Sequence, residues 1–276
     1  MEALHAAPLV DVEIATETTV AEIDPQTLGP SVGVLVRHHF NPAVVHDPDL
    51  AFFARAASVV RGVPVFLDIG ASIANTISSL MALHCRFQVD AFEINPALHA
   101  HLRRAATLYP GQCVVHPYGL DERPACSWLY MPVLNDFFVL GEASLSLAHL
   151  QQDRVKTQLR SYAPGAELRV GKLSVESRTL DSFTLKPDFI KIDVEGAEAR
   201  VLAGATDTLK RNRPIIMAEN SYPEEVRALL VPLGYSPYRF DAACGSLRPQ
   251  DHRTQNTFYV EDTWRSRLVG PGLISD

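Results

Sequence analysis

The chain has 276 residues, of which 47% are hydrophobic, and it carries 25 Lys and Arg against 32 Asp and Glu. A chain of this length and composition buries a substantial core as one domain, which excludes disorder as its main state. Six of the acids lie in residues 1–36, so the rest of the chain is nearly neutral. It therefore lacks the basic stripe of a surface that binds nucleic acid.

The start of the chain is acidic and has no positively charged segment followed by an apolar stretch, so we expect no secretory signal. No window approaches the roughly eighteen consecutive apolar residues of a spanning helix, so we expect no membrane insertion. The four cysteines show neither a CxxC motif nor zinc-site spacing. Free thiols in a reducing compartment fit this pattern, and we therefore expect a cytoplasmic protein.

Apolar runs of strand length alternate with amphipathic stretches of helical length from Val65 onward. This alternation predicts an α/β fold in which helices cover both faces of a mainly parallel sheet. The first strand is expected over residues 63–67, ending at Asp68. Later strands are expected over residues 89–92, 113–116, 188–192 and 214–218, and a helix is expected after the first, second, fourth and fifth strands.

The last part of the chain predicts a closing pair of strands over residues 238–240 and 257–260. This pair would complete a seven-stranded sheet with an antiparallel edge. About seventy residues separate the third and fourth strands, more than a crossover needs, so inserted structure is expected at about residues 121–187. We interpret residues 1–62 as an N-terminal cap segment, 63–265 as the main domain and 266–276 as a C-terminal tail.

Acidic residues follow the predicted strands, at the edge where open parallel sheets bind their ligands. The first strand leads into a turn in which Gly70 allows close approach of the backbone to a ligand. Glu93 closes the second strand, where an acid accepts hydrogen bonds from both hydroxyls of a ribose. Together these features favour an adenosine-type cofactor. The alternative is that Asp68 only caps a helix and Glu93 is a solvated strand end.

The glycine pattern favours S-adenosylmethionine over NAD as the cofactor. Dinucleotide folds seat a pyrophosphate on GxGxxG, whereas residues 70–75 read GASIAN and offer one glycine only. NAD is therefore disfavoured. S-adenosylmethionine has no pyrophosphate and needs a close turn, an acid for its ribose and polar groups for its amino-acid end.

These motifs resemble the FkbM-type S-adenosylmethionine-dependent methyltransferases. The resemblance covers about residues 63–260 and rests on residues 66–71 (FLDIGA), 92–96 (FEINP), 179–181 (TLD) and above all 189–198 (FIKIDVEGAE). It implies a Rossmann-like class I methyltransferase fold. It also implies methyl transfer to a hydroxyl oxygen of a small molecule such as a sugar, a glycoside or a polyketide-type natural product.

The sequence departs from the family pattern in two places. Ser72 and Ala74 stand where the family usually has Asn and a second Gly, and because Ala is the smallest replacement we expect cofactor binding to survive. Residues 118–121 (YGLD) replace the family's usual Asn-Xaa-Ala-Leu-like segment, which leaves the adenine contacts open. The resemblance implies a cofactor site made by Asp68, Gly70, Ala71, Ser72, Glu93, Ile94, Gly119, Leu120 and Asp193.

A hydroxyl is a poor nucleophile, so its methylation requires alignment with the methyl donor together with a base or a metal. Four side chains follow the fourth and fifth strands and are expected to converge at one cleft: Asp193, Glu195, Glu219 and Asn220. One hypothesis is a magnesium ion bound by Asp193, Glu219 and Asn220. The alternative is metal-free, with Asp193 or Glu219 as general base.

Lys191 is a third candidate catalytic residue beside Asp193 and Glu219. It lies on a buried strand and therefore needs a carboxylate partner, so a structural ion pair is the competing interpretation. The candidate partners are Asp68, Glu93, Asp181 and Glu219. His38, His39 and His46 lie in the predicted cap, where one of them could reach over the cleft as a base.

Two other functions stay open at this stage. The chain could bind the cofactor without turnover, or it could be an NAD-dependent oxidoreductase on a related sheet. The sequence names neither the acceptor nor the oligomeric state, and a homo-oligomer is compatible with it.

Overall fold

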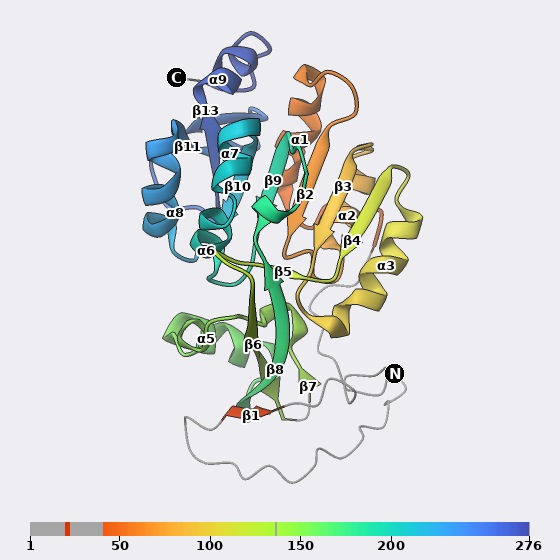
Figure 1. Ribbon diagram of the computed structural model, residues 1–276, viewed down its shortest axis with the longest axis vertical. Coiled ribbons are helices and arrows are strands. Elements are labelled where there is room, and N and C mark those ends of the chain that lie inside the picture. Colours follow the sequence, from red (N-terminus) through yellow and green to blue (C-terminus); the bar gives the residue numbers. More distant parts are fainter. Residues whose placement is uncertain (1–19, 23–40, 136, 276) are drawn as a thin grey trace.

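The computed structural model of the protein describes residues 20–22, 41–135 and 137–275. They form a large eight-stranded sheet and a smaller five-stranded sheet that lies beyond one end of it (Figure 1). The predicted α/β class is therefore confirmed. None of the helices in these ranges is long and apolar enough to cross a membrane.

The large sheet contains five neighbouring parallel strands and three further strands. The parallel strands are β2 (Val65–Ile69), β3 (Gln88–Phe92), β4 (Gln112–His116), β9 (Phe189–Ile192) and β10 (Ile215–Glu219). The other three are β11 (Tyr235–Asp241), β12 (Ser246–Pro249) and β13 (Asn256–Glu261). The order across the sheet is β12-β11-β13-β10-β9-β2-β3-β4. Strands β2 and β9 are parallel neighbours, and the chain adds later strands on opposite sides of this pair, so the order of the strands reverses there.

The predicted count of seven strands is corrected to eight. The expected pairing between the last two strands is present, with Tyr238 opposite Phe258 in an antiparallel ladder. However, β13 lies between β10 and β11 rather than at the edge. The extra strand β12 pairs with β11 at the edge and is too short and polar to stand out from the surrounding turn residues.

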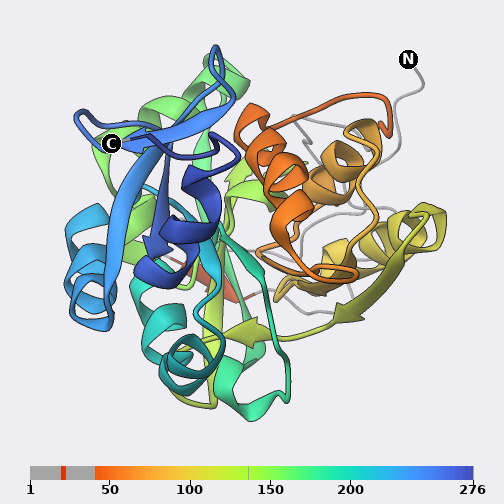
Figure 2. The same cartoon turned by 90° about the horizontal axis from the view of Figure 1, so that it is seen from above.

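Helices cover both faces of the large sheet (Figure 2). One face carries α1 (Ala51–Ala56), α2 (Asn75–Ala82), α3 (His99–Leu108) and α9 (Asp262–Val269), and the other carries α6 (Glu198–Ala203), α7 (Thr206–Asn212) and α8 (Pro223–Leu230). The single helix expected after the fourth strand is divided into α6 and α7. The division falls at Gly204, where a side chain would lie 2.0 Å from the carbonyl oxygen of Asp121.

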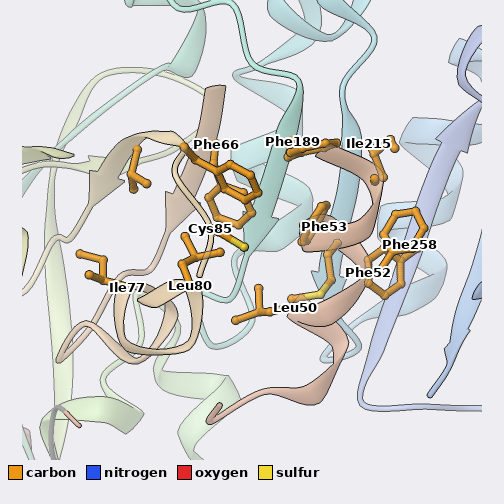
Figure 3. Close-up of a cluster of buried hydrophobic side chains, with 14 of the residues drawn as sticks. Leu50, Phe52, Phe53, Phe66, Ile77, Leu80, Cys85, Phe189, Ile215 and Phe258 are labelled. Carbon is orange, nitrogen blue, oxygen red and sulfur yellow. The ribbon is translucent and has the colours of Figure 1, made fainter. Parts of the chain in front are cut away.

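Aromatic side chains from distant parts of the chain form the core of the first face (Figure 3). Phe53 on α1 lies 5.2 Å from Phe66 and 5.5 Å from Phe258 between ring centroids. The described end of the predicted N-terminal cap is thus part of the main core. Helix α9 crosses the predicted boundary at residue 265, and Leu268 belongs to the same cluster.

The expected insertion forms most of the smaller sheet, to which β1 (Val20–Glu22) adds a strand from the predicted N-terminal cap. Its two long strands, β6 (Ala125–Leu134) and β8 (Leu168–Arg178), are antiparallel along their whole length. The short strands β1, β5 (Gly119–Leu120) and β7 (Phe137–Phe138) complete the sheet, with α4 (Leu147–Leu150) and α5 (Asp153–Tyr162) packed beside it. The insertion therefore faces the loops that follow the parallel strands of the large sheet (Figure 1).

Candidate active site

Two adjoining cavities lie between the strand-end loops of the large sheet and the insertion. The inner cavity has a volume of about 60 Å³ and is lined by Glu93, Ile94, Tyr118, Gly119 and Leu120, among others. The outer cavity has a volume of about 470 Å³ and is lined by His46, Asp47, Glu142, Tyr162 and Glu219, among others. The residues that line both, and so form their junction, are Gly70, Ser72, Leu140, Gly141, Asp193 and Glu195.

The loop after β2 is tightly constrained. The amide N–H groups of Gly70 and Ala71 both donate to the carbonyl oxygen of Phe92, at 3.0 Å each. Gly70 has φ +83°, and a side chain there would begin 1.8 Å from the carbonyl oxygen of Asp193. The absence of a side chain at Gly70 is therefore needed for contact with the loop after β9, while the backbone of Gly70 still lines both cavities.

The two departures from the family pattern both fall at left-handed backbone positions. Ser72 has φ +49° and Ala74 has φ +71°. Gly adopts this conformation readily because it has no Cβ to crowd the backbone, and Asn does so because its side chain can form local hydrogen bonds. Ala74 is therefore strained in its backbone, and the fold tolerates this strain.

Asp68 lies within β2, whereas the sequence predicted that it would follow the strand. It is fully buried and accepts a hydrogen bond of 2.9 Å from the hydroxyl of Thr76. Its carboxylate lies 3.8 Å from the ammonium of Lys191, and burial raises its pKa despite that charge. Asp68 lies beneath the cavities and does not line their described walls.

Glu93 is a buried carboxylate in the wall of the inner cavity, with a relative exposure of 6%. Its Oε2 accepts from the amide of Ser72 and its Oε1 accepts from the amide of Asn95, both at 2.7 Å. Burial raises its pKa to about 7. The alternative of a solvated strand end is therefore wrong. Ile94 and Gly119 complete this wall, and a side chain at Gly119 would begin 2.3 Å from Ile94 Cδ1.

Three carboxylates converge at the end of β9 and β10. Asp193, Glu195 and Glu219 each offer one oxygen, and these oxygens all lie within 4.8 Å of one another. We call these residues the acid triad. Burial, reinforced by Glu219 and Asp193, raises the pKa of Glu195 well above its usual range, and burial beside Asp193 raises the pKa of Glu219 to about 8. The triad therefore favours a bound cation.

Asn220, expected beside the triad as a metal ligand, forms hydrogen bonds to the loop before β13 and to β13 itself. Its amide nitrogen donates to the carbonyl of Thr254, and its amide oxygen accepts from the hydroxyl of Thr257, both at 2.9 Å. Glu195 takes the third place in the cluster. Its backbone has φ +52°, which a regular continuation of the strand would not predict.

Lys191 is the cation beneath the triad. Its ammonium lies 3.0 Å from Asp193 and 3.8 Å from Asp68. Burial lowers its pKa, but the two carboxylates together outweigh burial and raise the pKa above the usual value for Lys. Of the expected partners only Asp68 is found. Asp181 instead accepts backbone hydrogen bonds at the start of α7.

The outer cavity has further acids that the sequence pattern did not single out. Glu142 accepts hydrogen bonds from the hydroxyl of Tyr162 at 2.5 Å and from Gln158 at 3.2 Å, all within the insertion. Asp47 lines the opposite side and accepts from Asn256. Neither acid lies in a motif, so only the fold brings them to the cavity. His46 also lines it, whereas His38 and His39 lie outside the described residues.

His149 of α4 is buried behind the triad, with a relative exposure of 1%. Burial lowers its pKa to about 4, so the imidazole is neutral. Its Nε2 lies 3.5 Å from Oε2 of Glu195. No sequence pattern gives this histidine a role, because its partner is 46 positions away along the chain.

Comparison with known proteins finds a family match and two structural neighbours. Residues 68–237 match the methyltransferase FkbM domain. A solved FkbM methyltransferase from Methylobacillus flagellatus KT is 14% identical with a TM-score of 0.45, and the match covers 86% of this chain and 50% of that one. A precorrin-6y C5,15-methyltransferase from Geobacter metallireducens GS-15 is 11% identical with a TM-score of 0.39, covering 84% and 92%. No curated protein matches the chain.

Proposed function

The chain belongs to the FkbM-domain methyltransferase family, and we propose that it transfers a methyl group from S-adenosylmethionine to a hydroxyl oxygen of a small acceptor. One observation carries this proposal. The cavity that contains the buried carboxylate of Glu93 opens, at Asp193 and Glu195, into a larger and strongly acidic cavity. This arrangement offers, in order, a carboxylate that can accept hydrogen bonds from a ribose, a site for a positive charge and a cavity for the methyl acceptor.

The residues that line the inner cavity suit the adenosine half of the cofactor. Each oxygen of Glu93 accepts a hydrogen bond from one backbone amide and retains a lone pair for a ribose hydroxyl. Ile94, Gly119 and Leu120 provide apolar wall for the adenine ring. No feature of this cavity resembles a pyrophosphate seat, since the loop after β2 has one glycine and its first two amides are used by Phe92.

The junction fits the sulfonium. Asp193 and Glu195 line both cavities, and carboxylates at this depth attract a positive charge more strongly than carboxylates in water. S-adenosylmethionine bound there would supply the electrophilic methyl group. Lys191 and Asp68 act beneath the junction as positioning residues, because the 3.0 Å ion pair fixes the Asp193 carboxylate.

Two ways of activating the acceptor hydroxyl remain, and both use the acid triad. Glu219 or Asp193 could accept the hydroxyl proton directly, and the raised pKa of Glu219, about 8, suits a base that works near neutral pH. Alternatively, the triad fits a magnesium ion, which prefers carboxylate oxygens. Bound by Asp193, Glu195 and Glu219, the ion would lower the pKa of the acceptor hydroxyl.

The outer cavity favours a neutral, hydroxyl-rich acceptor such as a sugar, a glycoside or a polyketide-type natural product. Five carboxylates line it, from Asp47, Glu142 and the acid triad. Lys191 is the one Lys or Arg among its described lining residues, and that ammonium is already paired. Acceptors that carry phosphate or carboxylate groups would therefore be repelled.

Calorimetric titration tests the cofactor assignment. We expect S-adenosylmethionine and S-adenosylhomocysteine to bind in the micromolar range and NAD not to bind. Glu93→Ala should weaken both by at least tenfold, because the ribose hydroxyls lose their acceptor. Equal binding by Glu93→Ala and the unaltered protein would contradict the site. Binding without transfer of labelled methyl to any of a broad panel of polyols would favour a cofactor-binding protein without turnover.

A further inference from the structure

The loop that carries Glu195 is held in an unfavourable backbone conformation. Glu195 has φ +52° and Gly196 has φ +97°. A residue with a side chain adopts the left-handed conformation at a cost, so the surrounding contacts must fix it. These contacts come both from the insertion and from the elements that follow β9 and β10.

The backbone of the loop is anchored from two sides. The hydroxyl of Ser144, in the insertion, donates to the carbonyl oxygen of Glu195 at 2.5 Å. The buried carboxylate of Glu198, at the start of α6, accepts from the amides of Val194 and Gly196 at 3.2 and 3.1 Å. These bonds set where the Glu195 side chain begins but do not set where its carboxylate points.

His149 is the group that contacts the carboxylate itself. Its ring packs against Gly196, where a side chain would begin 2.6 Å from Nδ1, and it lies beside the ring of Tyr222. This packing holds the imidazole with its Nε2 3.5 Å from Oε2 of Glu195. A neutral ring protonated on Nε2 presents a donor to that oxygen.

We propose that His149 is a positioning residue that holds the Glu195 carboxylate at the junction of the two cavities. The insertion would then act on the reacting centre through α4, in addition to covering the outer cavity. The effect on cofactor binding rests on the proposed function. The ordering of the loop by His149 does not.

The proposal has a consequence that can be measured without an acceptor. S-adenosylmethionine carries a positive sulfur and S-adenosylhomocysteine does not, so a fixed carboxylate at the junction favours the former selectively. If the carboxylate is released, affinity for S-adenosylmethionine should fall while affinity for S-adenosylhomocysteine stays nearly constant. A general loosening of the site would weaken both.

The experiment compares three variants of the full chain. His149→Phe keeps a buried ring but removes the donor, and His149→Gln restores an amide donor at the position of Nε2. Tyr222→Phe is the matched control, because it removes the hydroxyl bonded to Gln152 beside His149 without removing a contact to Glu195. Should His149→Phe fail to fold, His149→Asn replaces it, since its shorter side chain does not reach Glu195.

Two readouts are taken for each variant. Calorimetry gives the ratio of the dissociation constants of the two ligands, and hydrogen exchange measures protection of the segment 193–198. For His149→Phe we expect about a fivefold to tenfold loss of selectivity, the scale of one buried polar contact, and faster exchange in this segment. His149→Gln should recover most of both effects, and Tyr222→Phe should show neither.

Unchanged exchange in His149→Phe would overturn the proposal, as would faster exchange with unchanged selectivity. Equal effects in Tyr222→Phe would overturn it too, because they would indicate general loosening. If the unaltered protein binds neither ligand, the proposed function fails, while hydrogen exchange still decides whether His149 orders the loop.

Discussion

The carbonyl oxygen of Asp193 occupies the space where a side chain on Gly70 would begin, 1.8 Å from the Cβ position. The loops after β2 and β9 thus meet backbone to backbone at the point where the order of the sheet reverses. Both Gly70 and Asp193 line the junction between the cavities. The close approach also places Asp193 beside the loop that carries Ser72.

Gly70→Ala should therefore be severely destabilising. The new methyl group would overlap a backbone carbonyl that cannot move without shifting β9, in addition to the strain of φ +83°. Gly165→Ala is a matched control, because Gly165 has the same φ of +83° with no atom within 4 Å of the Cβ position. Chemical denaturation should show a loss of about 1 kcal/mol for the control and more than about 3 kcal/mol for Gly70→Ala. Similar losses would contradict the steric explanation.

Lys191→Met should destabilise the fold strongly. It would leave Asp68 fully buried with no compensating charge, which typically costs about 3–5 kcal/mol. Arg239→Met, which breaks the exposed pair with Asp251, should cost far less stability, because water screens that pair. In the double variant Asp68→Asn with Lys191→Met, part of the stability should return. A simple sum of the two single losses would show that the pair is not coupled.

The pH dependence of cofactor affinity follows from Glu93. Its pKa of about 7 means that the carboxylate is protonated in acid, and a protonated carboxyl accepts the ribose hydroxyls less well. Affinity for S-adenosylhomocysteine should thus rise as the pH increases from 5 to 7, by up to about tenfold per unit, and level off above 7. Glu93→Gln should bind weakly with a flat profile over this range. A flat profile in the unaltered protein would contradict the assignment.

Metal dependence distinguishes the two ways of activating the acceptor. If magnesium is used, chelation should abolish methyl transfer, and Glu195→Gln should lower the affinity for Mg²⁺ in calorimetry by about tenfold or more. Glu142→Gln, which alters a nearby acid outside the triad, should bind Mg²⁺ normally. Full activity after chelation would instead indicate that Glu219 or Asp193 accepts the proton of the acceptor hydroxyl.

Much of the large sheet follows from the sequence because β3, β4, β9 and β10 are short apolar runs bounded by polar residues. The convergence of the residues at the ends of these strands can be predicted as well, since parallel strands bring their carboxyl ends to one edge of the sheet. Glu93, Asp193 and Glu219 were therefore predictable. Their neighbour Asn220 was expected in the same cluster for the same reason, and its hydrogen bonds to Thr254 and Thr257 depend on β13, which lies far along the chain.

Other features of the site depend on backbone conformation or on tertiary contact. Glu195 was expected at this edge beside Asp193 and Glu219, but the left-handed turn by which it reaches them is encoded in no periodicity. Glu142 and His149 come from the insertion, whose position beyond the strand ends is set by its own sheet. Asp68 could be identified as important but not placed, because strand ends are uncertain by a residue or two and one residue reverses the face of a strand.

A crystal structure with S-adenosylhomocysteine tests the central claim most directly. The ribose hydroxyls should lie within hydrogen-bond distance of Glu93, the adenine ring should contact Ile94 and Leu120, and the sulfur should lie at the junction beside Asp193 and Glu195. The outer cavity, with Glu219 in its wall, should then open directly beyond the sulfur. Adenosine bound away from Glu93, or a sulfur directed away from the acid triad, would contradict the proposed methyltransferase site.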